Sequence, residues 1–228
     1  MSVHVETNIN FATASDEEIK QFGRNIVRDN IVVVRNQDLH ESRILHVCET
    51  IGNVLKPKQF FMHPEHPGLF RVTSFCDTRR AYNELPQDIK EIVDDVDCTF
   101  QFKNNTFYKL EEGDKELIMF ENKRIYPDGV TKPLVYNHPY DNGKGLYFTF
   151  HYIREMWRRS GKDLDQEWLK QYLLDHVFQE KYIYHHNNWR TGDFIFMDQF
   201  HSIHKRNEVE GDRFLYRISF DYEGSFNE

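Results

Sequence analysis

The residues with the clearest chemical potential lie near the C-terminus, where a histidine precedes two arginines. His204 follows a polar corner, and Arg213 and Arg217 stand four residues apart in an alternating apolar run. Residues an even number apart share one face of a strand, so the two guanidinium groups are expected to point the same way. The planar guanidinium suits carboxylates and sulfonates better than the point charge of lysine does. The pattern therefore predicts a metal ligand beside a carboxylate-binding site.

A Gly-Asp turn and a strand-forming run precede this histidine. Trp-x-x-Gly-Asp occupies 189–193, and Met-Asp-Gln occupies 197–199. Together with His204 and the Arg-x-x-x-Arg pair, this pattern resembles the TauD/TfdA group of Fe(II)/2-oxoglutarate-dependent dioxygenases. Val-Val-Arg-Asn-Gln at 33–37 and Ala-Tyr-x-x-Leu at 81–85 resemble other segments of the same family. The similarity therefore extends towards both ends of the chain.

The resemblance implies a role for each matching residue. His204 corresponds to the distal iron ligand, and Arg213 to the arginine that grips the far carboxylate of 2-oxoglutarate. Thr73 falls where the family has a 2-oxoglutarate-binding threonine, and Arg217 corresponds to an arginine that often binds an acidic group of the substrate. The resemblance thus implies Fe(II) as cofactor, 2-oxoglutarate as cosubstrate, and oxidation or hydroxylation of a small anionic or amino-acid-like substrate.

The rest of the family's metal site has no counterpart in this sequence. A facial site of two histidines and a carboxylate leaves three positions open on iron, and the family takes two of those ligands from a His-x-Asp pair. No His-x-Asp occurs in the chain, and the stretch 66–80 is shorter than its family counterpart by several dozen residues. His63 and Glu65 have the matching spacing, but Pro64 between them favours a structural turn. We therefore expect the fold to be incomplete near residues 67–75.

Two functions from different classes remain open at this point. The preserved C-terminal motif favours a 2-oxoglutarate-dependent dioxygenase. The missing His-x-Asp favours a catalytically inactive β-barrel descendant that binds a small anion or serves as an interaction module. A truncated gene product is a third alternative.

The single residues also have structural alternatives. His204 could be a hydrogen-bonded core histidine, and Thr73 an ordinary β-branched strand residue. Arg213 could pair with a neighbouring carboxylate, although an inward arginine between apolar residues is costly to bury without an anion. His201 is expected to be exposed or to lie behind the site. Of the two histidines at 185–186, one is expected to pack inward.

Length and composition limit the protein's class. A chain of 228 residues can form one domain with a substantial core, here expected over 1–228. The net charge of -8 argues against nucleic acid or an anionic membrane as the main partner, so a small-molecule substrate is favoured. The sequence opens without a basic-then-apolar segment, and its 3 cysteines have no metal-like spacing. These features predict a cytoplasmic protein.

Periodicity predicts the elements that would position these residues. Apolar residues at helical spacing predict helices over 15–28, 41–52, 84–96 and 165–178, and β-branched or alternating runs predict strands over 31–35, 182–186, 194–198 and 214–222. Residues 132–148 are similar to a hairpin of the family. Aromatic residues form 15% of the chain, which suits a β-rich interior. The expected fold is mainly β with outer helices (α+β), a double-stranded β-helix (jelly roll).

Overall fold

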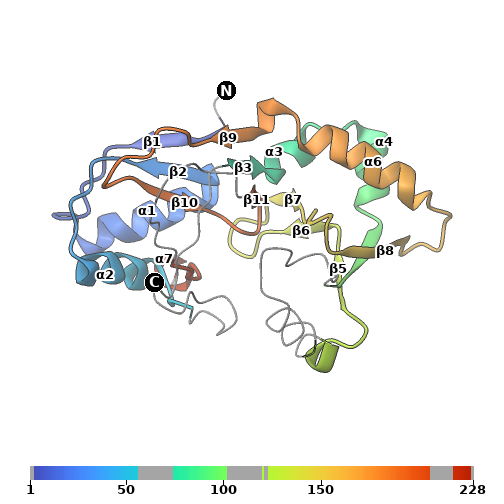
Figure 1. Cartoon of the computed structure of the whole chain (residues 1–228), viewed down its shortest axis with the longest axis horizontal. Helices are drawn as coiled ribbons and strands as arrows, with labels where there is room; N and C mark the ends of the chain where they lie inside the picture. Colours follow the sequence, from blue (N-terminus) through green and yellow to red (C-terminus); the bar gives the residue numbers. More distant parts are fainter. Residues whose placement is uncertain (1–2, 56–73, 102–119, 121–122, 206–217, 227–228) are drawn as a thin grey trace. The chain divides into compact units, whose positions relative to one another are not determined.

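The computed structural model describes residues 3–55, 74–101, 120, 123–205 and 218–226. The chain divides into two compact units, each considered by itself. Unit 1 comprises Met1–Asp77, Pro139–Asn142 and Glu180–Glu228, and unit 2 comprises Thr78–His138 and Gly143–Gln179. Both units combine helices with small β-sheets (Figure 1), so the α+β part of the predicted class is confirmed. A single domain over 1–228 stays a prediction.

The first two helices of unit 1 begin and end close to where the sequence predicts. Helix α1 spans Asp16–Asp29 and α2 spans Glu41–Ile51. The hydroxyl of Ser15 accepts a hydrogen bond from the Glu18 amide at 3.3 Å, and the Glu18 carboxylate accepts one from the Ser15 amide at 2.8 Å. This capping box satisfies two amide groups that would otherwise lack partners at the start of α1. The hydrogen bonds that the Glu18 carboxylate accepts from the Ser15 amide and hydroxyl also lower the pKa of Glu18.

The main sheet of unit 1 has the strand order β1-β2-β10. The central strand β2 (Ile31–Val34) is buried at every position and pairs in parallel with β1 (Val5–Thr7) and antiparallel with β10 (Phe194–Met197). Helices α1 and α2 cover one face of this sheet (Figure 1). The core between them contains Phe11, Ala14, Ile19, Phe22, Ile26, Val27, Val32, Val34, Val47, Ile51, Phe196 and Tyr222. The predicted strands at 31–35 and 194–198 are therefore confirmed.

A second sheet of unit 1 has the order β11-β3-β9. Strand β3 (Ser74–Asp77) lies in the centre and pairs antiparallel with β11 (Ser202–Lys205) and β9 (Ile183–His185). Strand β9 follows a short 3-10 helix over Glu180–Tyr182. The strand predicted over 182–186 is thus confirmed with a later start, because its first residue still belongs to the helical turn.

The C-terminal strand predicted over 214–222 is only partly described, and that part differs from the prediction. Residues 214–217 lie outside the described residues. The remainder pairs with the segment after α2 through hydrogen bonds from the Leu55 amide to the Ser219 carbonyl (2.7 Å) and from the Asp221 amide to the Asn53 carbonyl (3.1 Å). This pairing forms a single bridge rather than a strand, because the chain turns at once into the short helix α7 (Glu223–Phe226).

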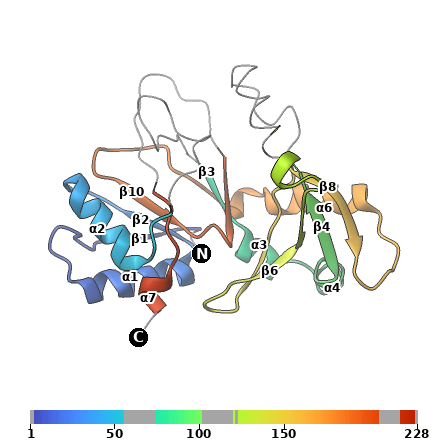
Figure 2. The same ribbon diagram turned by 90° about the horizontal axis from the view of Figure 1, so that it is seen from below.

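Among the residues that the structure describes, unit 2 contains a three-stranded sheet, a hairpin and several helices. The sheet has the order β5-β4-β8, with strands Val130–Pro133, Val96–Phe100 and Ile153–Arg158. The predicted hairpin is confirmed as β6 (Val135–Asn137) and β7 (Lys144–Leu146). These helices include α3 (Thr78–Asn83), α4 (Gln87–Val93) and α6 (Gln166–Val177), and Figure 2 shows the unit from below.

One helix boundary in unit 2 differs from the sequence-based prediction. The helix predicted over 84–96 is α4, which spans only Gln87–Val93. Pro86 precedes it, and the fixed φ of proline suits the position just before a helix rather than its interior. Val96 is buried and pairs with Arg158 in the sheet, so the following strand ends the helix early.

Candidate active site

Strand β11 places His204 on one face of the second sheet of unit 1. In the antiparallel register His204 lies opposite Phe75, and Phe75 lies opposite Tyr184. Antiparallel partners point to the same side of a sheet, so these three side chains form one row across it. The ring centroids of Phe75 and Tyr184 lie 6.3 Å apart. His204 itself is exposed at the outer end of this row.

The polar corner before β11 is fixed by hydrogen bonds from buried residues. Asp198 accepts a hydrogen bond from the Phe200 amide at 2.7 Å, and the Ser202 hydroxyl donates to the Asp198 carbonyl. The Asn30 side chain donates to the His201 carbonyl and to the Asp77 carboxylate, both at 2.8 Å. Asn30 is only 1% exposed. Because it contacts the end of β3 and the corner before β11, Asn30 helps to fix the direction in which β11 leaves.

The Gly-Asp turn before β10 packs directly against the corner that follows β2. Gly192 has a φ of 88°, which favours glycine. A Cβ at Gly192 would lie 2.6 Å from the carbonyl oxygen of Gln37, and the Gln37 amide donates to the Gly192 carbonyl at 2.9 Å. The glycine of the motif is therefore required both by the turn and by the close approach of a second backbone.

The aspartate of the turn is the buried centre of an ion-pair network. The Asp193 side chain has no exposed surface, and its carboxylate accepts from Arg35 Nη1 at 2.7 Å and from the Arg190 amide at 2.9 Å. Arg35 Nη2 also contacts Glu6 at 3.1 Å. Burial alone would lower the pKa of Arg35, but the hydrogen bonds to Glu6 and Asp193 raise it above its ordinary value. The network joins β1, β2 and the turn before β10.

A histidine and a tyrosine extend the network towards the row that contains His204. His186 is 1% exposed; its Nε2 lies 3.4 Å from the Asp193 carboxylate, and its Nδ1 lies 2.6 Å from the Tyr184 hydroxyl. Its ring packs edge-on against Trp189, with centroids 4.3 Å apart. Burial raises the pKa of Tyr184. Hydrogen bonds and ring contacts thus connect the Gly-Asp turn to the sheet that bears His204.

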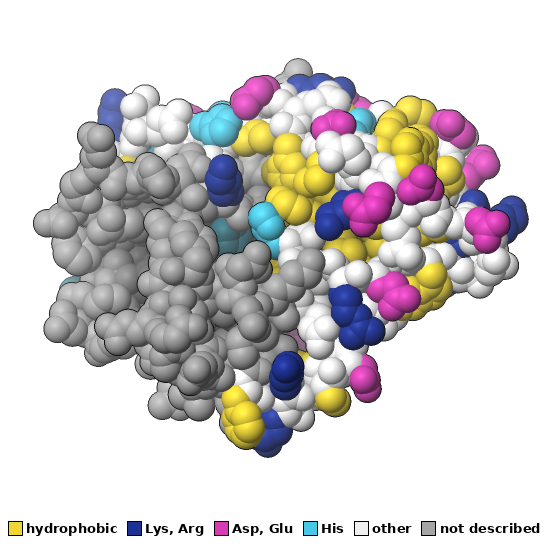
Figure 3. Space-filling model, turned by 45° about the vertical axis from the view of Figure 1, so that its right-hand side comes forward, with side chains coloured by type: hydrophobic (Ala, Val, Ile, Leu, Met, Phe, Trp, Pro, Cys, Tyr) yellow, Lys and Arg dark blue, Asp and Glu magenta, His cyan; other side chains and the backbone are white. Residues whose placement is uncertain are grey.

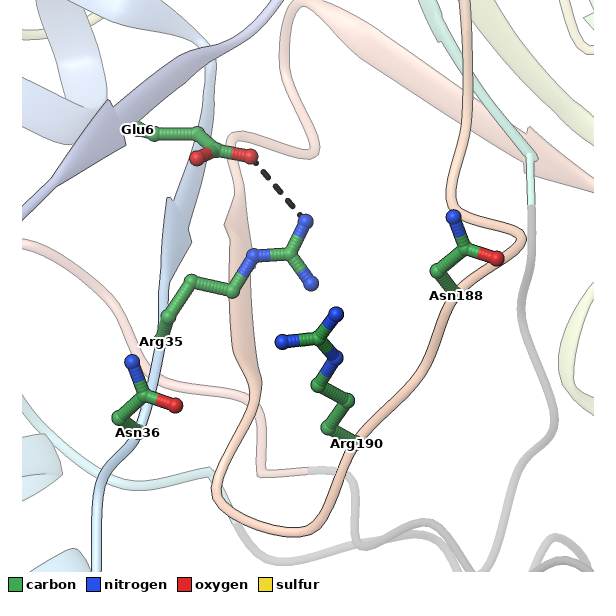
Figure 4. Close-up of a pocket in the computed structure, with 5 residues that line it drawn as sticks. All are labelled: Glu6, Arg35, Asn36, Asn188 and Arg190. Carbon is green, nitrogen blue, oxygen red and sulfur yellow. Dashed lines mark hydrogen bonds and ion pairs between the residues drawn. The ribbon is translucent and has the colours of Figure 1, made fainter.

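A pocket of about 290 Å³ opens beside this network. Its lining residues are Glu6, Arg35, Asn36, Asn188 and Arg190 (Figure 4). The two arginine head groups point toward one another, and the Asn188 side chain lies on the other side of the opening. The pocket therefore presents cationic and amide donors together with one carboxylate.

The structure describes only one of the residues predicted to bind metal, cosubstrate or substrate. That residue is His204. Thr73, Arg213 and Arg217 lie outside the described residues, and so does the His63–Glu65 pair. Within the described ranges, no three His, Cys, Asp or Glu side chains are grouped so that they could hold a metal ion. Because a facial site needs three ligands, His204 with its described neighbours does not fit Fe(II).

The other histidine predictions have mixed outcomes. His186 is buried while the His185 side chain is 37% exposed, which confirms that one of this pair packs inward. His201 was expected to be exposed or to lie behind the site; it is fully buried, which contradicts the first alternative and agrees with the second. Its burial follows from the Asn30 and Ser202 hydrogen bonds, which hold the corner against the unit.

Cysteine chemistry is disfavoured in both units. All three cysteines are buried, and burial raises the pKa values of Cys48, Cys76 and Cys98 to about 12. A thiol with so high a pKa is protonated near neutral pH and is a poor nucleophile or metal ligand.

The sequence-based predictions missed two residues that organise this region, Arg35 and Asn30. A usable signal existed for Arg35, since a charged residue ending a buried β-branched strand needs a buried partner, and the Gly-Asp turn supplies one. Nothing in the local sequence marked Asn30 as a residue whose side chain binds Asp77 and His201, both distant in sequence.

Comparison with known proteins identifies the family. A family model described as "Taurine catabolism dioxygenase TauD, TfdA family" matches residues 72–219. The chain belongs to the TauD/TfdA family. The matched range contains the Gly-Asp turn, the polar corner, His204 and both C-terminal arginines.

Curated relatives point to the same family. The chain is 30% identical over 151 residues to an alpha-ketoglutarate-dependent 2,4-dichlorophenoxyacetate dioxygenase of Burkholderia sp. (strain RASC), which covers 64% of this chain and 47% of that protein. It is 28% identical over 151 residues to the protein of the same name from Cupriavidus pinatubonensis, covering 64% and 49%. The chain thus spans about half the length of the curated relatives it matches.

Solved structures show the same fold. AAD-2, crystallised with Mn(II) and N-oxalylglycine, is similar with a TM-score of 0.68 at 19% identity, covering 96% of this chain and 94% of that one. A taurine dioxygenase from Burkholderia xenovorans is similar with a TM-score of 0.70 at 16% identity, covering 96% and 87%. The chain therefore shares the fold of TauD-like dioxygenases.

None of the helices in the described ranges combines the length and apolar character that crossing a membrane requires. Figure 3 shows acidic and basic side chains interspersed with hydrophobic ones over the described part of the face it displays.

Proposed function

We propose that this chain is an Fe(II)/2-oxoglutarate-dependent dioxygenase that hydroxylates or otherwise oxidises a small anionic or amino-acid-like substrate. The observation that carries the proposal is the family match across 72–219, which includes the Gly-Asp turn and His204. The names of the curated relatives support an anionic substrate, since 2,4-dichlorophenoxyacetate is a small carboxylate.

The proposal assigns four residues by their place in the family motif. His204 is the distal metal ligand, Arg213 and Thr73 bind 2-oxoglutarate, and Arg217 contacts the substrate. The exposure of His204 on β11 supports its role, because a ligand nitrogen must be reachable. The remaining metal ligands would have to lie outside the described residues, where His63 and Glu65 have suitable spacing.

The same proposal covers the architecture and setting. We propose that the strands described in each unit belong to a jelly roll, as the likeness to TauD-like structures supports. The net charge of -8 supports a small molecule, rather than nucleic acid or a membrane, as the partner of a cytoplasmic enzyme.

The test is an anaerobic titration of the purified chain with Fe(II) and 2-oxoglutarate, in which the visible charge-transfer band of the ternary complex is recorded. We expect the band in the parent chain. Arg213→Leu should weaken 2-oxoglutarate binding about ten- to a hundredfold, since it removes a charge-assisted contact of about 1.5–3 kcal/mol. Arg213→Lys should recover part of the loss, because an ammonium group lacks the guanidinium fork.

A matched control separates this effect from a general change of charge. Arg28 lies in the last turn of α1, its side chain is 68% exposed, and it pairs with the adjacent Asp29. Arg28→Leu should therefore leave the titration unchanged. Binding that is unaltered in Arg213→Leu would mean that another arginine anchors the cosubstrate. No band in the parent chain at millimolar 2-oxoglutarate would favour the inactive descendant, a small-anion-binding or interaction module.

A further inference from the structure

The pocket beside Arg35 contains an arginine whose charge is not balanced by its described neighbours. Arg35 is neutralised by Asp193 at 2.7 Å and by Glu6 at 3.1 Å. Arg190 is exposed, and its side chain makes no ion pair with any residue that the structure describes. Its head group nevertheless points toward that of Arg35 (Figure 4). Two guanidinium groups facing one pocket repel each other unless an anion lies between them.

The surroundings of the pocket order the Arg35 guanidinium and the Arg190 backbone before any ligand arrives. Arg35 is held from behind by the buried Asp193 carboxylate, and Arg190 is fixed through its own backbone, which exchanges hydrogen bonds with Asp193 at 2.9 and 3.0 Å. Asn36 adopts a φ of 55°, a conformation that asparagine tolerates, and also lines the pocket. A guanidinium that is already ordered, such as that of Arg35, loses little entropy when it binds a ligand.

We propose that this pocket is a second binding site, for a small oxyanion with carboxylate or phosphate oxygens, that bridges Arg190 and Arg35. Guanidinium groups present paired N–H donors that match such oxygens, and Asn36 and Asn188 add neutral amides. The volume of about 290 Å³ lies at the lower end of the range for ligand pockets, so the ligand is small. None of the lining residues is among those proposed to bind 2-oxoglutarate.

Glu6 indicates how the site is occupied. Its carboxylate contacts Arg35 Nη2, and its side chain is 52% exposed at the rim of the pocket. An incoming anion therefore competes with Glu6 for the same guanidinium nitrogen. Removal of the Glu6 charge should tighten binding, whereas loss of Arg190 should weaken it. Opposite responses of two neighbouring residues are a signature that a general loss of folding would not produce.

The test is isothermal titration calorimetry of the full chain at low ionic strength, with inorganic phosphate and with succinate in separate experiments. We expect Arg190→Leu to weaken binding at least tenfold, the loss of one charge-assisted contact. Glu6→Gln should strengthen binding, and Arg28→Leu should leave it unchanged. Binding of only one probe would assign the site to phosphate or to carboxylate groups.

The Arg213→Leu background separates this site from the proposed cosubstrate site. Binding that persists in Arg213→Leu and is lost when Arg190→Leu is added belongs to the Arg35 pocket. Binding that is lost in Arg213→Leu but unchanged in Arg190→Leu would overturn the proposal and leave the proposed function intact. The absence of binding of both probes to the parent chain, with the unfolding midpoint of the chain intact, would also overturn it.

Discussion

The two halves of the C-terminal motif have different surroundings within one unit. The Gly-Asp turn is buried against the corner after β2, and its aspartate contacts Arg35 and the Arg190 backbone. His204, at the other end of the motif, is exposed on β11. The difference shows that a motif found as one run of sequence can combine a structural half with a half available for chemistry.

The physical reason lies in the cost of burial. A carboxylate without exposed surface, such as that of Asp193, must have charged or hydrogen-bonding partners. Those partners fix the turn before β10 and, through His186 and Tyr184, reach the sheet that carries His204. A histidine that binds a metal needs an accessible nitrogen instead. The first half of the motif therefore stabilises the fold, and the second half presents the exposed His204.

The largest effect should come from the structural half. We expect Arg35→Leu to reduce the free energy of unfolding by about 3 kcal/mol, the lower end for breaking a buried ion pair, because the Arg35 side chain is 29% exposed while Asp193 is fully buried. Urea denaturation monitored by circular dichroism measures this loss of unfolding free energy. The control Arg28→Leu breaks a pair whose arginine side chain is 68% exposed and should cost less than about 1 kcal/mol. Equal losses of unfolding free energy in Arg35→Leu and Arg28→Leu would contradict the structural role of the Gly-Asp half of the motif.

The glycine of the turn provides a second, smaller test. Gly192→Ala should cost about 2 kcal/mol, because alanine is strained at a positive φ and its Cβ would lie 2.6 Å from the Gln37 carbonyl oxygen. Gly161 is the matched control, with a φ of 74° and no atom within 4 Å of an added Cβ. Gly161→Ala should therefore cost about 1 kcal/mol, for the backbone strain alone. If thermal unfolding shows the same loss of stability for Gly192→Ala and Gly161→Ala, the contact with Gln37 is not the reason that position 192 requires glycine.

Local patterns predicted much of this fold. The capping box at Ser15 fixed the start of α1, the β-branched run predicted β2, and the hairpin of unit 2 lies where its sequence indicates. The boundary of α4 was predicted less well, because the residues at its end fit both the helical period and a strand. The pairing of Val96 in the sheet places the end of the helix before that residue.

The contacts around the candidate site could not be predicted in the same way. Arg35 and Asp193 are 158 positions apart, and Asn30 contacts residues 47 and 171 positions away. Such pairs form only when strands from distant parts of the chain meet, and no local period encodes which strands do so. The motif revealed His204 by type and spacing, but its exposure and its row with Phe75 and Tyr184 follow from the sheet register.

The smallest effect on stability and the largest on chemistry should occur at His204. An exposed side chain contributes little to folding, so His204→Ala should change the free energy of unfolding by less than about 0.5 kcal/mol. The most direct test of the account is the release of succinate from 2-oxoglutarate by the chain with Fe(II) and oxygen, compared between the parent and His204→Ala. We predict turnover in the parent and none in the folded variant. A parent chain that releases no succinate, or a variant that matches the parent, would contradict the assignment of this half of the motif to chemistry.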